Sequence, residues 1–249
     1  MSAVDATPAA ATAPRVLTTL PTFYRLLLRT QLSLARVLGI GALGALTVLL
    51  GVLAGQNDDP NQAAGDVATF ALGLVVPLAT LWLGTSALGD LVEDRLLVYV
   101  WLKPVPRWQL PAAAVLATTT LVIPLTAVPV GAEALVAGAD EIALEAFLAA
   151  TLAGFAYAGV FVAAGLWFRR AAWWGLAFVL LWENAAAYLA EGLTRYTIVG
   201  WAGSILDSAP GSVSEISAGR AGVAYVVLPA IAIAGWLVAT WRYRKGELD

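Results

Sequence analysis

The sequence predicts an all-α membrane protein whose chain crosses the bilayer six times, and three observations support this. Hydrophobic residues make up 60% of the chain and charged residues 12%, whereas about a quarter of an average soluble domain is charged. Six stretches reach the roughly 20 mostly apolar residues that a helix needs to span the hydrocarbon core. If these stretches are spans, 12 of the 14 Lys and Arg residues fall on one side of the membrane.

The basic residues also predict the orientation, because Lys and Arg near span ends stay in the cytoplasm. Both termini are therefore expected to be cytoplasmic, in a multi-pass protein of the cell inner or plasma membrane. The two remaining basic residues, Arg195 and Arg220, lie in external segments, where most acids also fall at or near the span ends. Those acids include Asp58, Asp59, Asp66, Glu133, Asp140, Glu141 and Glu145. The predicted spans are 37–55, 67–88, 110–131, 143–168, 171–189 and 223–241.

Two segments precede the first span. Residues 1–19 are rich in Ala, Thr and Pro and are expected to be disordered. In the segment 20–36, Arg25, Arg29 and Arg36 fall on one face at helical spacing. This pattern predicts an amphipathic interfacial helix along the inner membrane surface. The alternative is a basic flank that only fixes the topology.

The composition leaves little room for catalysis. The chain has no Cys and no His, which excludes disulfides, thiolate chemistry and His-based acid–base catalysis. It also lacks the glycine-rich loop followed by Lys and Ser or Thr that binds nucleotide phosphates. The sequence therefore predicts no intrinsic catalytic site and no cofactor or metal bound by this chain.

The most informative segment is the inner loop 90–107, which connects span two to the start of span three near Leu110. It combines charged residues with apolar ones and ends in a Pro-containing basic stretch, whereas a plain linker is polar and Gly/Ser-rich. An apolar stripe ringed by charges favours docking to a soluble partner. The alternative is a helix that only lies on the membrane. The residues concerned are Asp90, Glu93, Asp94, Arg95, Tyr99, Trp101, Lys103, Pro104 and Arg107.

This layout resembles the permease subunits of type-2 ATP-binding-cassette exporters. The resemblance rests on Glu93-Asp94-Arg95, the apolar run 99–102 and Lys103-Pro104-Val105-Pro106-Arg107. The surface helix before span one, the Trp182-Glu183 pair and the basic tail 242–249 agree with it. One departure is Leu96-Leu97, where many relatives have Gly-Thr.

The resemblance implies a half-transporter that pairs with a second permease protomer, identical or homologous. A separate ATPase subunit would bind ATP and Mg, and the loop 90–107 would be its coupling helix. The implied cargo is a hydrophobic or amphipathic compound such as a drug, an antibiotic or a lipid. Two alternatives are a membrane enzyme, which would need more polar residues in its spans, and a structural or regulatory protein such as an anchor or immunity factor.

Glu183 is the one acid deep in a predicted span, about 20 Å beyond the inner boundary. Acids at such depth usually face a partner or a wet cavity. Asn184 or Tyr188 is expected to hydrogen-bond it near the outer end of the pathway. A gating or structural role, direct contact with cargo, and a position at the outer headgroups all remain open.

Prolines and glycines within the predicted spans are further features of the sequence. Pro77, Pro124, Pro129 and Pro229 interrupt spans and act either as hinges or as static kinks. Gly51-x-x-x-Gly55 is a candidate helix crossing. The external segment 190–222 is too short and polar for two more spans, and a re-entrant or surface hairpin that caps the outer mouth is expected there.

Overall fold

The computed structural model describes residues 16–93, 106–184, 193–209 and 216–245. These residues are helical apart from short connections, and five of the helical stretches are long and apolar enough to cross a membrane. The chain is therefore a multi-pass membrane protein. The five stretches are α2 (Leu34–Ala54), Pro60–Asp90, Gln109–Ala137, α8 (Asp140–Trp167) and α12 (Ala221–Lys245).

The sixth predicted span, 171–189, is described only in part. Helix α9 (Ala171–Ala177) continues directly into the π-helix η3 (Phe178–Asn184). Residues 185–189 of the predicted span lie outside the described residues. The described segment is thus too short to count as a membrane-crossing helix, and six spans stay a prediction.

Two of the long stretches change helix type midway. The first consists of α3 (Pro60–Phe70), η1 (Ala71–Val75) and α4 (Val76–Glu93). The second consists of α6 (Gln109–Val122), η2 (Ile123–Ala127) and α7 (Val128–Ala137). Each π-helical turn ends two residues before a proline, Pro77 or Pro129. A proline cannot supply the amide that an α-helix needs four residues later, so the helix accommodates it by local widening.

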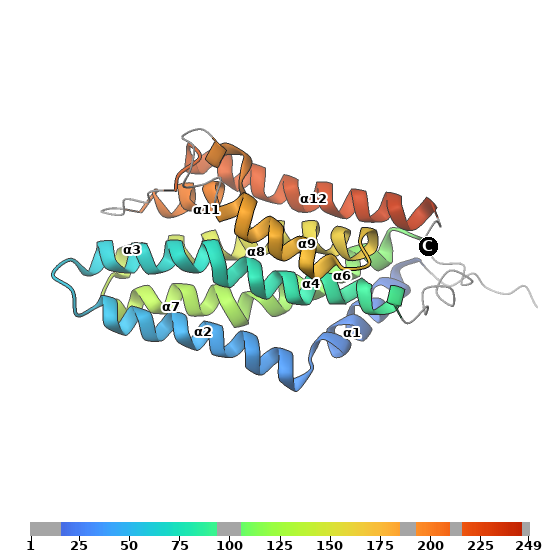
Figure 1. Ribbon diagram of the computed structural model, residues 1–249, viewed down its shortest axis with the longest axis horizontal. Helices are drawn as coiled ribbons and strands as arrows, with labels where there is room; N and C mark the ends of the chain where they lie inside the picture. The colour runs from blue at the N-terminus through green and yellow to red at the C-terminus, as the bar shows by residue number, and fades with distance from the viewer. Residues whose placement is uncertain (1–15, 94–105, 185–192, 210–215, 246–249) are drawn as a thin grey trace, which may run out of the picture.

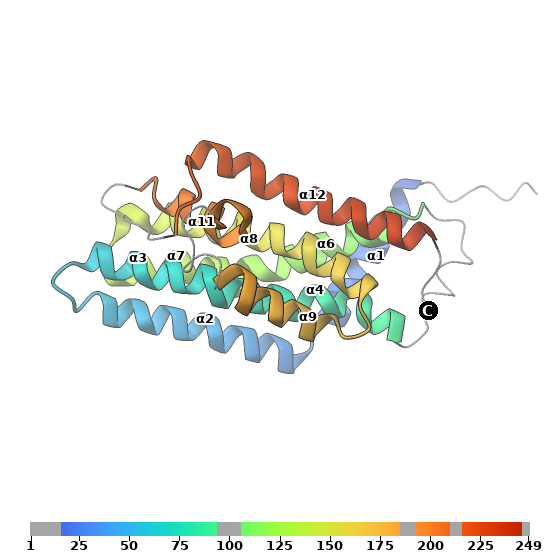
Figure 2. The same ribbon diagram turned by 45° about the horizontal axis from the view of Figure 1, so that its top comes forward.

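The long helices run alternately up and down in a bundle around α8 (Figures 1 and 2). Helix α8 packs against α4, α12, α7, α11 (Ile198–Leu206) and α6. Its buried face consists largely of Ala and Gly, which allow neighbouring backbones to approach closely. At the crossing with α12, a Cβ added to Gly159 would lie 2.5 Å from the carbonyl oxygen of Ala232.

A second close crossing joins α2 to the stretch Gln109–Ala137. A Cβ at Gly44 would meet the Leu125 carbonyl oxygen at 2.6 Å, and one at Gly51 would meet the Glu133 carbonyl oxygen at 2.5 Å. At Gly55 the corresponding distance to the Ala137 carbonyl oxygen is 3.0 Å. The structure therefore places Gly51 and Gly55 at a helix crossing, as the sequence suggests. We call this contact the α2–α7 seam.

Helix α1 (Val16–Gln31) lies before α2 and is separated from it at Leu32 and Ser33. Its bounds differ from the predicted 20–36, because Ser33 caps α2 by accepting a bond from the amide of Arg36. Leu27 and Gln31 are buried, and α1 packs against α6. Arg25 and Arg29 are exposed on α1, whereas Arg36 belongs to the first turn of α2.

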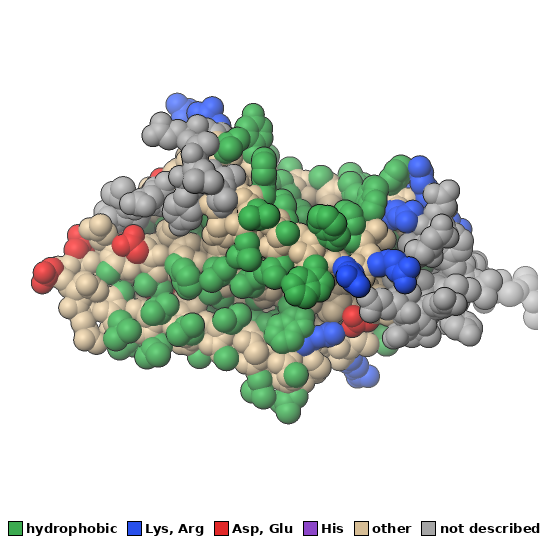
Figure 3. All heavy atoms as spheres, viewed as in Figure 1, with side chains coloured by type: hydrophobic (Ala, Val, Ile, Leu, Met, Phe, Trp, Pro, Cys, Tyr) green, Lys and Arg blue, Asp and Glu red, His purple; other side chains and the backbone are tan. Residues whose placement is uncertain are grey.

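The two ends of the bundle carry opposite charges. On the face seen in Figure 3, most Lys and Arg lie towards one end and most Asp and Glu towards the other, with apolar side chains between them. The basic end holds the starts of α2, α6 and α9 and the ends of α4, α8 and α12, and both described ends of the chain lie there (Figure 1). The basic end is defined by Arg36, Arg107, Arg169, Arg170, Arg242, Arg244 and Lys245. The acidic end is defined by Asp58, Asp59, Asp66, Asp140 and Glu141.

Candidate functional site

Glu183 lies at the centre of a buried polar cluster in the half of the bundle nearer the acidic end. Its side chain is fully buried. One carboxylate oxygen accepts bonds from the Tyr157 hydroxyl at 2.8 Å and from the Val199 amide at 2.9 Å. The other accepts from the Ile198 amide at 3.1 Å. All three partners are donors, so the geometry suits an acceptor-only carboxylate.

The two amides belong to the first turn of α11, within the segment that sequence predicts as an external hairpin. The first amides of a helix have no partner inside it, and they carry partial positive charge. Thr197 caps the same turn by accepting a bond from the Gly200 amide at 3.0 Å. Glu183 and Thr197 together therefore hold the start of α11 inside the protein, where every residue from Ile198 to Leu206 except Trp201 is buried.

The rest of the segment is anchored by neighbouring residues. Trp182 donates its indole N–H to the Tyr196 carbonyl at 3.3 Å, so both members of the Trp-Glu pair contact this region. Ser204 on α11 accepts from the amides of Ala218 at 2.9 Å and Gly219 at 3.1 Å. These bonds tie the chain leading into α12 back onto α11.

Asn184 does not hydrogen-bond Glu183, in contrast to the sequence expectation. Its side-chain amide donates to the Gly73 carbonyl at 3.0 Å and to the Val179 carbonyl at 2.8 Å. Gly73 lies four residues before Pro77, so its carbonyl lacks the amide donor that an α-helix would supply. Asn184 replaces that donor and thereby joins η3 to η1. Tyr188 lies outside the described residues.

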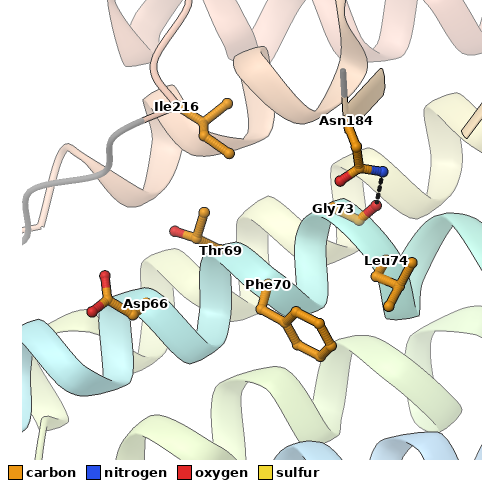
Figure 4. A pocket seen from close by; sticks show the side chains of 7 residues that line it. All are labelled: Asp66, Thr69, Phe70, Gly73, Leu74, Asn184 and Ile216. Atoms are coloured by element: carbon orange, nitrogen blue, oxygen red, sulfur yellow. Dashed lines mark hydrogen bonds between the residues drawn. The ribbon is translucent and has the colours of Figure 1, made fainter. Parts of the chain in front are cut away.

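A cavity of about 250 Å³ borders this contact. Figure 4 shows Asp66 and Thr69 on α3, with Asn184 and Ile216 contributed from across the cavity. Its lining mixes a carboxylate, a hydroxyl and an amide with apolar groups, which suits a small amphipathic molecule. The lining residues are Asp66, Thr69, Phe70, Gly73, Leu74, Asn184 and Ile216.

The basic end brings together two regions that sequence analysis treats separately. Arg36 forms an ion pair with Asp90 at 3.0 Å, which links the start of α2 to the last turns of α4. The Asp90 side chain is 55% exposed, so this pair contributes at most about 1 kcal/mol. Arg107 donates to the Arg244 carbonyl at 2.8 Å and so connects the approach to α6 with the end of α12.

Much of the predicted coupling loop lies outside the described residues. Glu93 is the last residue of α4. The predicted residues in the range 94–105 are Asp94, Arg95, Tyr99, Trp101, Lys103 and Pro104, all outside the described part. The described residues show that α4 ends and α6 begins at the basic end, so both ends of this loop lie there.

Sequence reasoning missed several buried polar residues. Tyr157 looks like one more aromatic residue in an apolar helix, yet its hydroxyl supports Glu183. Glu133 is counted from sequence among the external acids, but the structure buries it completely inside α7. Within the described ranges, no group of three or more Asp, Glu, His or Cys residues is arranged to hold a metal ion.

The chain matches no protein-family model, and no curated protein is similar to it in sequence.

Proposed function

We propose that this chain is the transmembrane permease subunit of an ATP-binding-cassette exporter, with ATP hydrolysed by a separate subunit. The observation that carries the proposal is the acidic–apolar–basic segment 90–107, which connects α4 to α6 at the basic end. Among the described residues at the basic end, the connection between α8 and α9 is much shorter, because it consists of Phe168, Arg169 and Arg170 alone. A chain without a nucleotide-binding motif needs such a surface if it receives energy from a partner.

The buried polar cluster fits an outer gate in this proposal. Glu183 holds α11 in the bundle at the end opposite the coupling segment, and the cavity at Asn184 lies beside it. Motion driven at the basic end would reach this region through α4, which continues into η1 and α3. The cavity's mixed lining supports a hydrophobic or amphipathic cargo. The permease would work as a dimer with an identical or homologous protomer.

Co-purification tests the partner directly. The tagged full-length chain, solubilised in detergent from its native membrane, is expected to bring down an ATPase subunit whose activity responds to cargo. Glu93→Lys and Arg107→Glu are expected to reduce cargo-stimulated ATP hydrolysis at least about tenfold, because each reverses a charge of the coupling segment. Arg220→Glu is the matched control at the opposite end, where the stimulated rate is expected to stay unchanged.

Two results would contradict the proposal. One is a pure chain that moves cargo with no ATPase present. The other is full stimulation in both coupling-segment variants. A chain that retains no ATPase and moves no cargo would instead favour the structural or regulatory alternative. Thermal unfolding of each variant checks that Arg107→Glu does not act by loosening its bond to the Arg244 carbonyl.

A further inference from the structure

Glu133 is a buried acid to which the function proposed above gives no role. Its side chain is fully buried, and neither carboxylate oxygen has a hydrogen-bond partner among the described residues. It lies at the α2–α7 seam, where its backbone and Cβ contact the position of Gly51. The backbone amides of α2 at this level are already bonded within the helix, so the seam offers Glu133 no free donor.

The charges on the surrounding elements do not compensate for a negative Glu133. Helix α7 packs against α2, α8, α3 and η2. The basic residue on α2 is Arg36, 15 positions before Gly51 and therefore about 22 Å away along the helix. The other charged residues of these four elements are acids of the same sign as Glu133: Asp66 on α3, whose N-cap is Asp59, and Asp140, Glu141 and Glu145 on α8.

An isolated carboxylate without partners is strongly unfavourable in apolar surroundings, and such a group instead retains its proton. Both carboxylate oxygens of Glu133 are enclosed by packed helices, and a proton is small enough to bind there. We propose that Glu133 is a proton-binding site, loaded while the α2–α7 seam is closed and emptied when the seam opens.

The position of Glu133 provides the route for exchange. It lies four residues before Ala137, where α7 ends at the acidic end of the bundle. This corresponds to about 6 Å along the helix. Separation of α2 from α7 near Gly51 would therefore expose the carboxyl to solution at that end. The closed seam would hold one more proton than the open one, and its stability would fall as the pH rises.

The test compares the pH dependence of thermal unfolding in detergent for the wild-type full-length chain and Glu133→Gln, which keeps the size of a neutral carboxyl but cannot release a proton. Unfolding also separates the seam, so where Glu133 of the unfolded chain is ionised the wild-type folded-to-unfolded ratio is expected to fall up to about tenfold per pH unit relative to the variant. The control Glu141→Gln, an exposed acid at the start of α8, is expected to follow the wild type. Parallel curves for wild type and Glu133→Gln would overturn the proposal.

Infrared spectroscopy gives a second readout that does not need Glu133→Gln to fold. At neutral pH the wild-type chain is expected to show the carbonyl stretch of a protonated carboxylic acid, and Glu183→Gln is expected to retain it. Where Glu133→Gln folds, the band should be missing. A wild-type spectrum without this band at neutral pH would overturn the proposal, as would its loss in Glu183→Gln alone.

Discussion

Glu133 and Glu183 are both fully buried acids in apolar helices, yet their surroundings differ completely. Glu183 accepts three hydrogen bonds, whereas neither oxygen of Glu133 has a partner within the described residues. The reason is the part of the neighbouring helix that each acid meets. Glu183 faces the first turn of α11, where amides are free, and Glu133 faces the last turn of α2 near Gly51, where amides are already bonded within the helix. Two equally buried acids therefore differ in whether the neighbouring helix supplies hydrogen-bond donors.

The largest expected effect comes from removing the Glu183 carboxylate. Glu183→Ala leaves two backbone amides and the Tyr157 hydroxyl without their acceptor, and each buried unsatisfied group costs about 1–3 kcal/mol. We expect a loss of about 3 kcal/mol or more in the free energy of unfolding, measured by denaturant titration in detergent. The control Glu141→Ala, at an exposed position, should change it by less than about 0.5 kcal/mol. An equal cost for both variants would remove the distinction between the two acids.

An intermediate effect is expected at the seam that contains Glu133. Gly51→Ala would place a Cβ 2.5 Å from the Glu133 carbonyl oxygen, so α2 and α7 must move apart. Overpacking of this kind costs about 1–3 kcal/mol. Gly41→Ala, on the same helix, meets no atom within 4 Å and is expected to be neutral or stabilising by up to about 1 kcal/mol through helix propensity. The same denaturant titration compares them, and a stabilising Gly51→Ala would contradict the close crossing.

The smallest effect concerns the donor that Asn184 provides. Asn184→Ala leaves the Gly73 carbonyl without this bond and should cost about 1 kcal/mol. In a Pro77→Ala background, residue 77 gains an amide that can donate to Gly73, so the cost of Asn184→Ala should shrink. A double-mutant cycle measures this coupling. Additive costs would show that Asn184 does not replace the donor lost at Pro77.

The positions of the five long apolar helical stretches are predictable from apolar length alone. The predicted span 143–168 corresponds to α8 at Asp140–Trp167, and 223–241 lies within α12 at Ala221–Lys245. The structural bounds extend beyond the predicted ones at the start of α8 and at both ends of α12, where they include charged residues such as Asp140 and Lys245. The predicted helix 20–36 extends past Gln31, where α1 ends. Ser33 is a residue type that is preferred at N-caps, and it starts α2 there.

The contacts of the buried polar residues could not be predicted in the same way. Tyr157 is 26 positions before Glu183 in the chain, and Ile198 is 15 positions after it. Their meeting depends on how α8, η3 and α11 pack, which apolar periodicity does not encode. Glu133 was misplaced for a related reason: its position near a span end suggested exposure, whereas the contact with Gly51 encloses it.

Cross-linking from the basic end tests the central claim, that this chain receives its energy from an ATPase partner. The chain contains no Cys, so a photoreactive probe on Pro106→Cys would report from one position beside the coupling segment. In native membranes this probe is expected to attach to a polypeptide with a nucleotide-binding motif, and the same probe on Asp140→Cys at the acidic end is not. Labelling of lipid alone from Pro106→Cys, in a protein that still moves cargo, would contradict the account.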